Sequence, residues 1–253
     1  GDCYLSADTV GGGTPTPTAT PTNTATATAT MSPTPTATIT PTPTPTATVA
    51  NKRVLMIVGS LTLNAGDGAI RTRLENTGYT VTISDDNATH PVDLANYEVV
   101  YISATISSGN ITNKYKSAAK PVIIAESWIF DDMGMTGTVT DTDYGTIGAQ
   151  TQIDMADTHP IAGGLTGTQT IQSAADTFHW GIPGGGAATV ARIRGSSTNA
   201  CIFTYDAGSS LKDGTTAAGK RIGLWPGDTT FNNVNSAGQE LFDRAFMWAL
   251  GLI

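Results

Sequence analysis

Threonine occupies every even-numbered position from 14 to 48 except one, which is Ser32, and this repeat limits what the first fifth of the chain can fold into. The odd positions hold mainly proline and alanine, and residues 14–49 carry no charge. Each proline fixes φ and lacks an N–H, so the eight prolines of this tract exclude a helix. The residue before each proline also becomes extended. We therefore expect a backbone near polyproline II that spans roughly 110 Å.

Tracts rich in threonine, serine and proline are typical of O-glycosylated stalks. The sequence therefore predicts a stalk over residues 14–50, and the alternative is a bare flexible linker. The predicted sites of glycosylation are Thr14, Thr16, Thr18, Thr20, Thr22, Thr24, Thr26, Thr28, Thr30, Ser32, Thr34, Thr36, Thr38, Thr40, Thr42, Thr44, Thr46 and Thr48.

The segment before the tract, residues 1–13, has the partial alternation of a short strand but no neighbouring strand to pair with. We interpret it as a docking segment that adds to a neighbouring domain, and the alternative is a frayed amino terminus on a monomer. It contains Cys3, and the only other cysteine is Cys201. The sequence predicts a disulfide between them, within one chain or between chains, and the alternative is two unpaired thiols.

Composition limits the partners of the chain. The formal net charge is −8, which argues against nucleic acid, because phosphate binding favours a basic surface. Only 13% of the 253 residues are charged, which favours an extracellular or cell-surface protein. No apolar run is close to the length of a membrane span, which is about 18 residues. Neither cysteine lies in a metal-binding pattern, and three isolated histidines make no metal site, so we expect no metal and no cofactor.

Residues 52–253 alternate between apolar strand patterns and helical patterns. This order predicts an α/β domain with a flavodoxin-like, open, mainly parallel sheet and flanking helices. Expected helices cover residues 65–77, 111–119 and 236–250, the last with Ser236 as its N-cap. Residues 131–186 are expected to form loops with short strands. Expected strands cover residues 53–59, 79–84, 98–103, 121–125, 189–194, 200–205 and 221–225.

Three stretches together resemble a known family: KRVLMIVGS at 52–60, THPIAGGL at 158–165, and KRIGLWPGDTTF with SAGQELFDRAFMWALG at 220–251. They are similar to the flavodoxin-like domain related to class I glutamine amidotransferases and ThuA-like proteins, which is appended to secreted bacterial proteins. The amidotransferases use a cysteine on a sharp turn after a strand, paired with His and Glu. Here the comparable stretch, PVIIAESWIF, has no cysteine. We therefore expect no enzyme activity, and no catalysis at Glu126, Ser127 or His159.

The carboxyl ends of parallel strands form the usual ligand crevice of such sheets. Four residues are candidates for a ligand crevice at that edge: Glu126, Trp128, Trp225 and Asp228. For the tryptophans, a place in the core is the favoured interpretation. His159 beside a proline and His179 beside a tryptophan favour structural roles. Acidic pairs at 131–132 and 141/143 lack calcium-loop spacing and favour solvated loops.

Together these features predict a structural subunit of an extracellular glycosylated filament or surface coat, assembled head-to-tail through residues 1–13. Its partners would be copies of itself and covalent glycans. One alternative is a stalked carbohydrate-binding or cell-surface module. Another is a hydrolase or amidotransferase-like enzyme with an unrecognised site.

Overall fold

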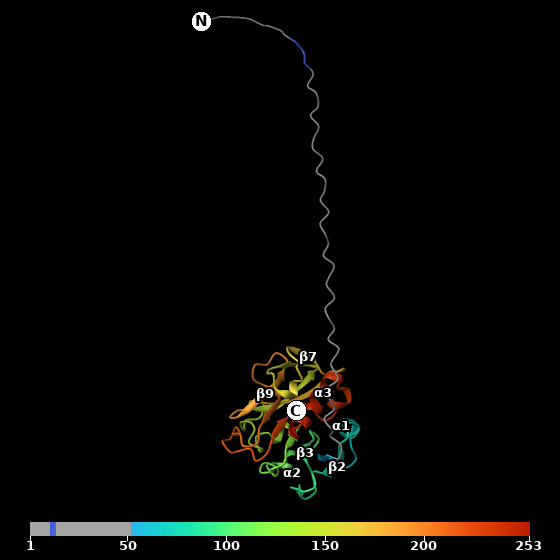
Figure 1. The fold of residues 1–253 in the computed structure, drawn as a ribbon, viewed down its shortest axis with the longest axis vertical. Helices are drawn as coiled ribbons and strands as arrows, with labels where there is room; N and C mark the ends of the chain where they lie inside the picture. The colour runs from blue at the N-terminus through green and yellow to red at the C-terminus, as the bar shows by residue number, and fades with distance from the viewer. Residues whose placement is uncertain (1–10, 14–51) are drawn as a thin grey trace. The chain divides into compact units, whose positions relative to one another are not determined.

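A computed structural model describes residues 11–13 and 52–253 (Figure 1). The chain divides into two units, residues 1–44 and 45–253, and the second contains the α/β domain. The predicted docking segment, the stalk with its glycosylation sites, and Cys3 fall outside the described residues, apart from Gly11–Gly13. Those predictions therefore stay untested.

Five parallel strands form one half of the sheet. Their order is β2-β1-β3-β4-β11, and each neighbouring pair is parallel. The continuous apolar runs of β1, β3 and β4 are buried on both faces, as parallel strands covered on two sides require. The five strands are β1 (Arg53–Val58), β2 (Thr80–Asp85), β3 (Val99–Ile102), β4 (Val122–Ile124) and β11 (Arg221–Gly223).

The other half of the sheet is antiparallel and continues in the order β11-β10-β9-β6-β7, with β8 pairing both β10 and β5. The predicted strand pair at 189–194 and 200–205 is confirmed as β9 and β10. The α/β fold with an open sheet is thus confirmed, with a larger antiparallel part than the sequence indicates. These strands are β5 (Tyr144–Gln150), β6 (Gln152–Met155), β7 (Thr168–Thr170), β8 (Asp176–Gly181), β9 (Ala187–Ile193) and β10 (Ala200–Tyr205).

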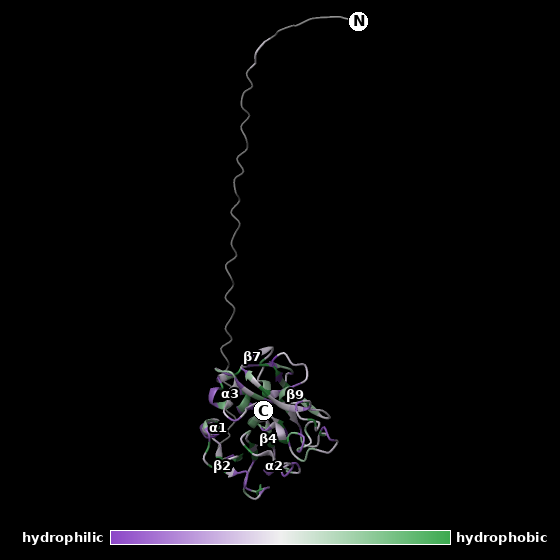
Figure 2. Ribbon diagram, turned by 180° about the vertical axis from the view of Figure 1, so that it is seen from behind, coloured by the Kyte–Doolittle hydropathy of each residue, from purple (hydrophilic) through white to green (hydrophobic). Residues whose placement is uncertain are grey.

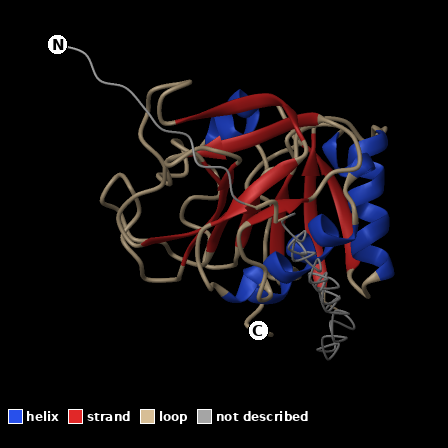
Figure 3. Cartoon of the chain, turned by 90° about the horizontal axis from the view of Figure 1, so that it is seen from above, coloured by secondary structure: helices blue, strands red, loops and turns tan. Residues whose placement is uncertain are grey.

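Two hydrophobic layers cover the parallel strands, and Figure 3 shows helices on both sides of the sheet. On one face, α1 (Ala65–Asn76) and α3 (Ser236–Ala249) pack Leu74 and Phe242 onto the sheet. On the other, the short α2 (Ser108–Ile111) and the chain after it supply Ile111 and Tyr115. In Figure 2 the hydrophobic colour follows the central strands.

The prediction of a helix over residues 111–119 is wrong. Helix α2 ends at Ile111, Thr112 takes a positive φ of 46°, and turns follow. The buried guanidinium of Arg221 holds these turns, because it donates to the carbonyls of Lys116 at 2.9 Å and Ala118 at 2.6 Å. The start of α3 also differs: its N-cap is Asn235, whose side chain accepts from the Gly238 N–H at 3.1 Å, in place of Ser236.

A glycine in β11 permits close packing within the sheet. A Cβ on Gly223 would lie 2.4 Å from ring atoms of Phe203. Phe203 is fully buried, so its ring has little room to move. We expect Gly223→Ala to lower the free energy of unfolding by roughly 1–3 kcal/mol, because overpacking strains a close-packed core. Urea denaturation measures this change.

The matched control for that prediction is Gly68→Ala in α1, where a Cβ meets nothing within 4 Å. It should raise the free energy of unfolding by about 0.5–1 kcal/mol, because alanine costs less conformational entropy than glycine in a helix. An equal effect of the two substitutions would contradict the packing described for β11.

Candidate functional site

A cleft of about 500 Å³ lies where several strands of the sheet end. Glu126 follows β4, Asp228 follows β11 and Ala104 follows β3, so the carboxyl edge of the parallel strands forms one wall. Strands β5 and β8 form the opposite wall. Three of the four residues expected at this edge are therefore together. The lining residues are Ala104, Glu126, Trp128, Thr146, Asp176, Thr177, His179, Gly227, Asp228 and Thr229.

Glu126 is the most deeply buried acid of this cleft, with 6% of its surface exposed. It caps the short 3-10 helix η1 (Ser127–Ile129): the Trp128 N–H donates to Oε1 at 2.8 Å. Its Oε2 has no hydrogen-bond partner among the described residues. Burial, and secondarily the charge of Asp228, raises the pKa of Glu126 to about 8. At neutral pH the carboxyl is therefore largely protonated.

His179, a residue of β8, lines the same cleft as Glu126 and is also buried. Its Nδ1 accepts the Ser127 N–H at 3.0 Å, so the proton of the neutral ring is on Nε2. Burial lowers the pKa of His179 to about 3, which keeps the ring neutral. The Trp128 ring stands edge-on to it, with centroids 5.8 Å apart. The packing role that the sequence favours for His179 is observed, and the residue lines the cleft as well.

Asp228 lies in the loop between β11 and the 3-10 helix η3 (Thr230–Asn233). The loop is held against α1, because Asn64 Nδ2 donates to the Asp228 carbonyl at 3.0 Å. Burial, then the charge of Asp176, raises the pKa of the Asp228 carboxyl. Thr229 Oγ1 donates to Asp176 at 3.3 Å, which ties this loop to β8. Asp176 and Asp228 thus lie close together in the lining of the cleft.

A second, smaller cleft of about 180 Å³ lies next to the first, and the sequence did not suggest it. Asp67, in the first turn of α1, is 2% exposed and accepts the hydroxyls of Ser103 at 2.6 Å and Thr105 at 2.8 Å. Burial raises its pKa, with a smaller contribution from the charge of Asp228. Because both hydroxyls face one carboxylate, these contacts also fix the end of β3.

Trp225 does not line the crevice, so that candidate is wrong, and the core position favoured from the sequence is observed. Its side chain is fully buried in the hydrophobic core. Only its main chain meets the cleft wall: the Trp225 carbonyl accepts the His179 N–H at 2.9 Å. Trp128 is the tryptophan that reaches the surface, with 37% exposed. The first residues after β11 thus turn the tryptophan inward and Asp228 outward.

Other residues singled out from the sequence lie elsewhere. His159 caps the 3-10 helix η2 (Pro160–Ala162), where its Nδ1 accepts the Ile161 N–H at 3.2 Å, and its ring packs on Trp248. His90 contacts the Tyr115 hydroxyl at 2.7 Å. Within residues 52–253, no group of three His, Cys, Asp or Glu side chains is placed to hold a metal ion.

Cys201 is buried within β10 and is a free thiol in the described part of the chain. Burial raises the pKa of this thiol above its ordinary range. The predicted pairing with Cys3 stays untested, because Cys3 falls outside the described residues. A thiol with a raised pKa inside a strand is a poor nucleophile.

No known family model matches this sequence, and no curated protein matches it. Solved structures do share the fold. A GMP synthase component from Thermoplasma acidophilum has a TM-score of 0.51 and 12% identity, covering 79% of this chain and 94% of that one. PurLQS of Thermotoga maritima has a TM-score of 0.46 and 12% identity, covering 78% and 98%. A glutamine amidotransferase of Thermotoga maritima has a TM-score of 0.41 and 10% identity, covering 79% and 82%.

The first of these structures shows the fold of this domain: it is that of glutamine amidotransferase-like proteins. This likeness contradicts the prediction of a structural subunit of a glycosylated filament or surface coat, and the correction is to a domain with an amidotransferase-like fold. Of the helices in the described ranges, none has the length and apolar character needed to cross a membrane.

Glu126 occupies the place after β4 where the resemblance leads one to expect a nucleophile. Its backbone is relaxed, with φ −84° and ψ 108°, so no strained turn presents its side chain. The following Ser127 is fully buried, and its hydroxyl has no partner within the described residues. The described part of the cleft thus offers carboxyl groups and a neutral imidazole, and no thiol.

Proposed function

We propose that residues 52–253 bind a small polar ligand in the Glu126–Asp228 cleft and do not carry out thiol-dependent amide transfer. The observation that carries the proposal is Glu126, a buried carboxyl whose Oε2 is unpartnered and which lines an open cleft. A buried carboxyl without a cation beside it costs stability, and such costs are commonly found at functional sites. The likeness to an amidotransferase fold agrees with a ligand site at this edge.

The lack of catalysis is part of the same proposal. A nucleophile needs an adjacent base or a lowered pKa. The described cysteine is buried with a raised pKa, and His179 is kept neutral with Nδ1 already engaged. Binding without turnover is what this set of groups supports. Release of ammonia from glutamine by the purified protein, lost in Glu126→Gln, would contradict it.

Ligand binding is tested on the indole N–H resonance of Trp128, which lies in the lining of the cleft. The probes are glutamine, glutamate, n-butylammonium, n-butanol and n-butyrate, each added to the purified protein. At least one should move the Trp128 resonance in a saturable way, while Trp248, a buried residue of α3 that does not line the cleft, serves as the internal reference. If every probe leaves Trp128 as unmoved as Trp248, the cleft is no binding site for this range of chemistry and the proposal fails.

A further inference from the structure

The charges around the cleft are all of one sign. The acids that line it are Glu126, Asp176 and Asp228; no lysine or arginine is among the lining residues, and His179, which is, stays neutral. Asp67 lies close enough for the charge of Asp228 to act on its carboxyl. Four acids therefore share one edge of the sheet with no cation to offset them. An isolated set of like charges is unfavourable, and a bound cation removes that cost.

An exposed aromatic ring stands in the same cleft. Trp128 is held by its edge-on contact with His179, while part of its surface faces solvent. Tryptophan is the aromatic side chain that best attracts a cation over its face. Within the described residues the acids do not form a three-ligand metal arrangement, which favours an organic cation over a metal ion.

The geometry points to an alkylammonium ligand: its ammonium group contacts Oε2 of Glu126 and the carboxylates of Asp228 and Asp176, and its alkyl part lies on Trp128. This inference rests on the proposed binding function and adds the chemical class of the ligand. A primary ammonium has three donors, which matches a cleft that offers acceptors and lacks a competing cation. A neutral or anionic ligand would leave the acidic residues unpaired.

The charge state of Glu126 gives the proposal a pH signature. The charge that acts on it is that of Asp228, while Asp176 lines the same cleft, Asp67 lines the neighbouring one, and His179 is neutral. On β5, the hydroxyl of Tyr144 is engaged with Asp131. A cation binds the ionised carboxylate, so affinity should rise with pH up to about 8 and then level off. Below pH 8 the affinity changes by at most about tenfold per pH unit, because binding of the cation releases one proton.

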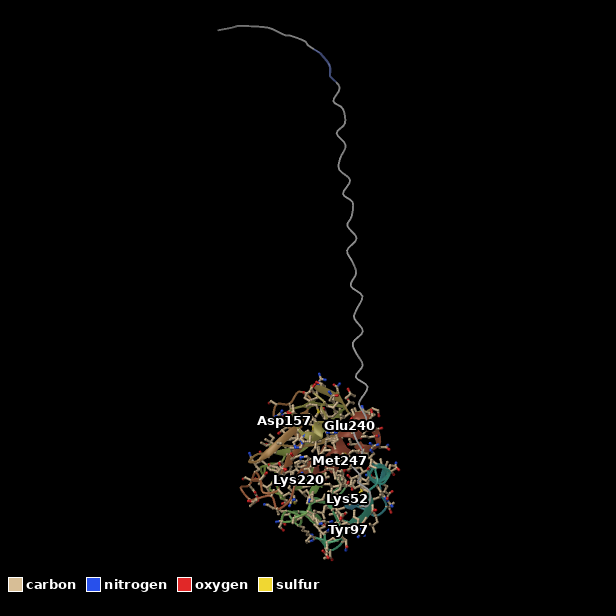
Figure 4. All side chains as sticks on the ribbon, in the orientation of Figure 1. Lys52, Tyr97, Asp157, Lys220, Glu240 and Met247 are labelled. Carbon is tan, nitrogen blue, oxygen red and sulfur yellow. The ribbon has the colours of Figure 1, made fainter. Side chains whose placement is uncertain are left out.

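The experiment titrates n-butylammonium, with n-butanol and n-butyrate as isosteres of different charge, and follows the Trp128 indole resonance. We expect n-butylammonium to bind at least about tenfold more tightly than n-butanol, and Asp228→Asn to weaken it about tenfold. The control, Asp157→Asn, removes one negative charge from an exposed residue that does not line the cleft (Figure 4) and should leave binding unchanged.

The outcomes separate the two proposals. If n-butanol or n-butyrate moves the Trp128 resonance and n-butylammonium does not, the site binds a ligand but the inferred cation is wrong. If n-butylammonium binds but its affinity falls as pH rises from about 6 to about 9, the carboxylate of Glu126 is not its partner and the inference is overturned. If Asp228→Asn and Asp157→Asn weaken n-butylammonium binding equally, the effect comes from general surface charge, and the inference is overturned as well.

Discussion

The Glu126→Gln variant is expected to unfold at a higher urea concentration than the natural sequence at pH 8, and at nearly the same concentration at about pH 4. The pKa of this buried carboxyl is raised from 4.5 to about 8. The folded state therefore holds a proton that the unfolded state has lost, and stability falls as pH rises through this window. The shift of the pKa from 4.5 to about 8, at about 1.4 kcal/mol per pH unit, limits the gain in the free energy of unfolding of Glu126→Gln at pH 8 to about 5 kcal/mol.

Glutamine suits this test because its Oε1 can still accept the Trp128 N–H at the start of η1. The control is Glu240→Gln on α3, an acid with 40% of its side chain exposed, labelled in Figure 4. It should change the free energy of unfolding by less than about 1 kcal/mol at either pH. A Glu126→Gln variant less stable than the natural sequence at pH 8 would mean that the charged carboxylate stabilises the fold.

The second large effect concerns Arg221, which has no exposed surface. Besides Lys116 and Ala118, its guanidinium donates to the carbonyls of Lys220 at 3.0 Å and Lys120 at 3.3 Å. Burial lowers the pKa of Arg221 to about 10, so it stays charged at neutral pH. Arg221→Met keeps most of the side-chain volume and removes every donor. We expect a loss of roughly 3 kcal/mol or more, because buried carbonyls are left unpaired.

Denaturation by urea checks this value, with Arg194→Met as the control. Arg194 is exposed, and its loss should cost less than about 1 kcal/mol. Hydrogen exchange adds a local readout: amides in residues 112–120 should lose protection in Arg221→Met before the rest of the sheet. Were the two variants equally stable, the carbonyls of this segment would not depend on Arg221.

The parallel half of the sheet could be predicted from sequence because its strands are buried on both faces and give continuous apolar runs. The run at Arg53–Val58 and the amphipathic helix α3 are examples. The segment 111–119 could not, because the positive φ of Thr112 ends α2 and the turns that follow are held by Arg221, which lies about a hundred residues later. A local pattern carries no information about such a distant donor.

The site was predictable in part for the same reason. Glu126 and Asp228 follow parallel strands, so their common edge follows from the fold class. The inward turn of Trp225 depends on core packing, which a single sequence does not specify. Asp67 carried a weak signal as an acid in the first turn of a helix, and its contact with Ser103 and Thr105 needs the folded sheet.

The most direct test of the cleft is an NMR titration of the Glu126 side-chain carboxyl in the ligand-free protein. A buried, protonated carboxyl at the base of an acidic cleft requires a midpoint near 8. The midpoint should fall in Asp228→Asn, because the charge of Asp228 contributes to raising it, and stay in place in Asp157→Asn. A midpoint near the ordinary value of 4.5 would contradict the account, since Glu126 would then be a solvated surface acid.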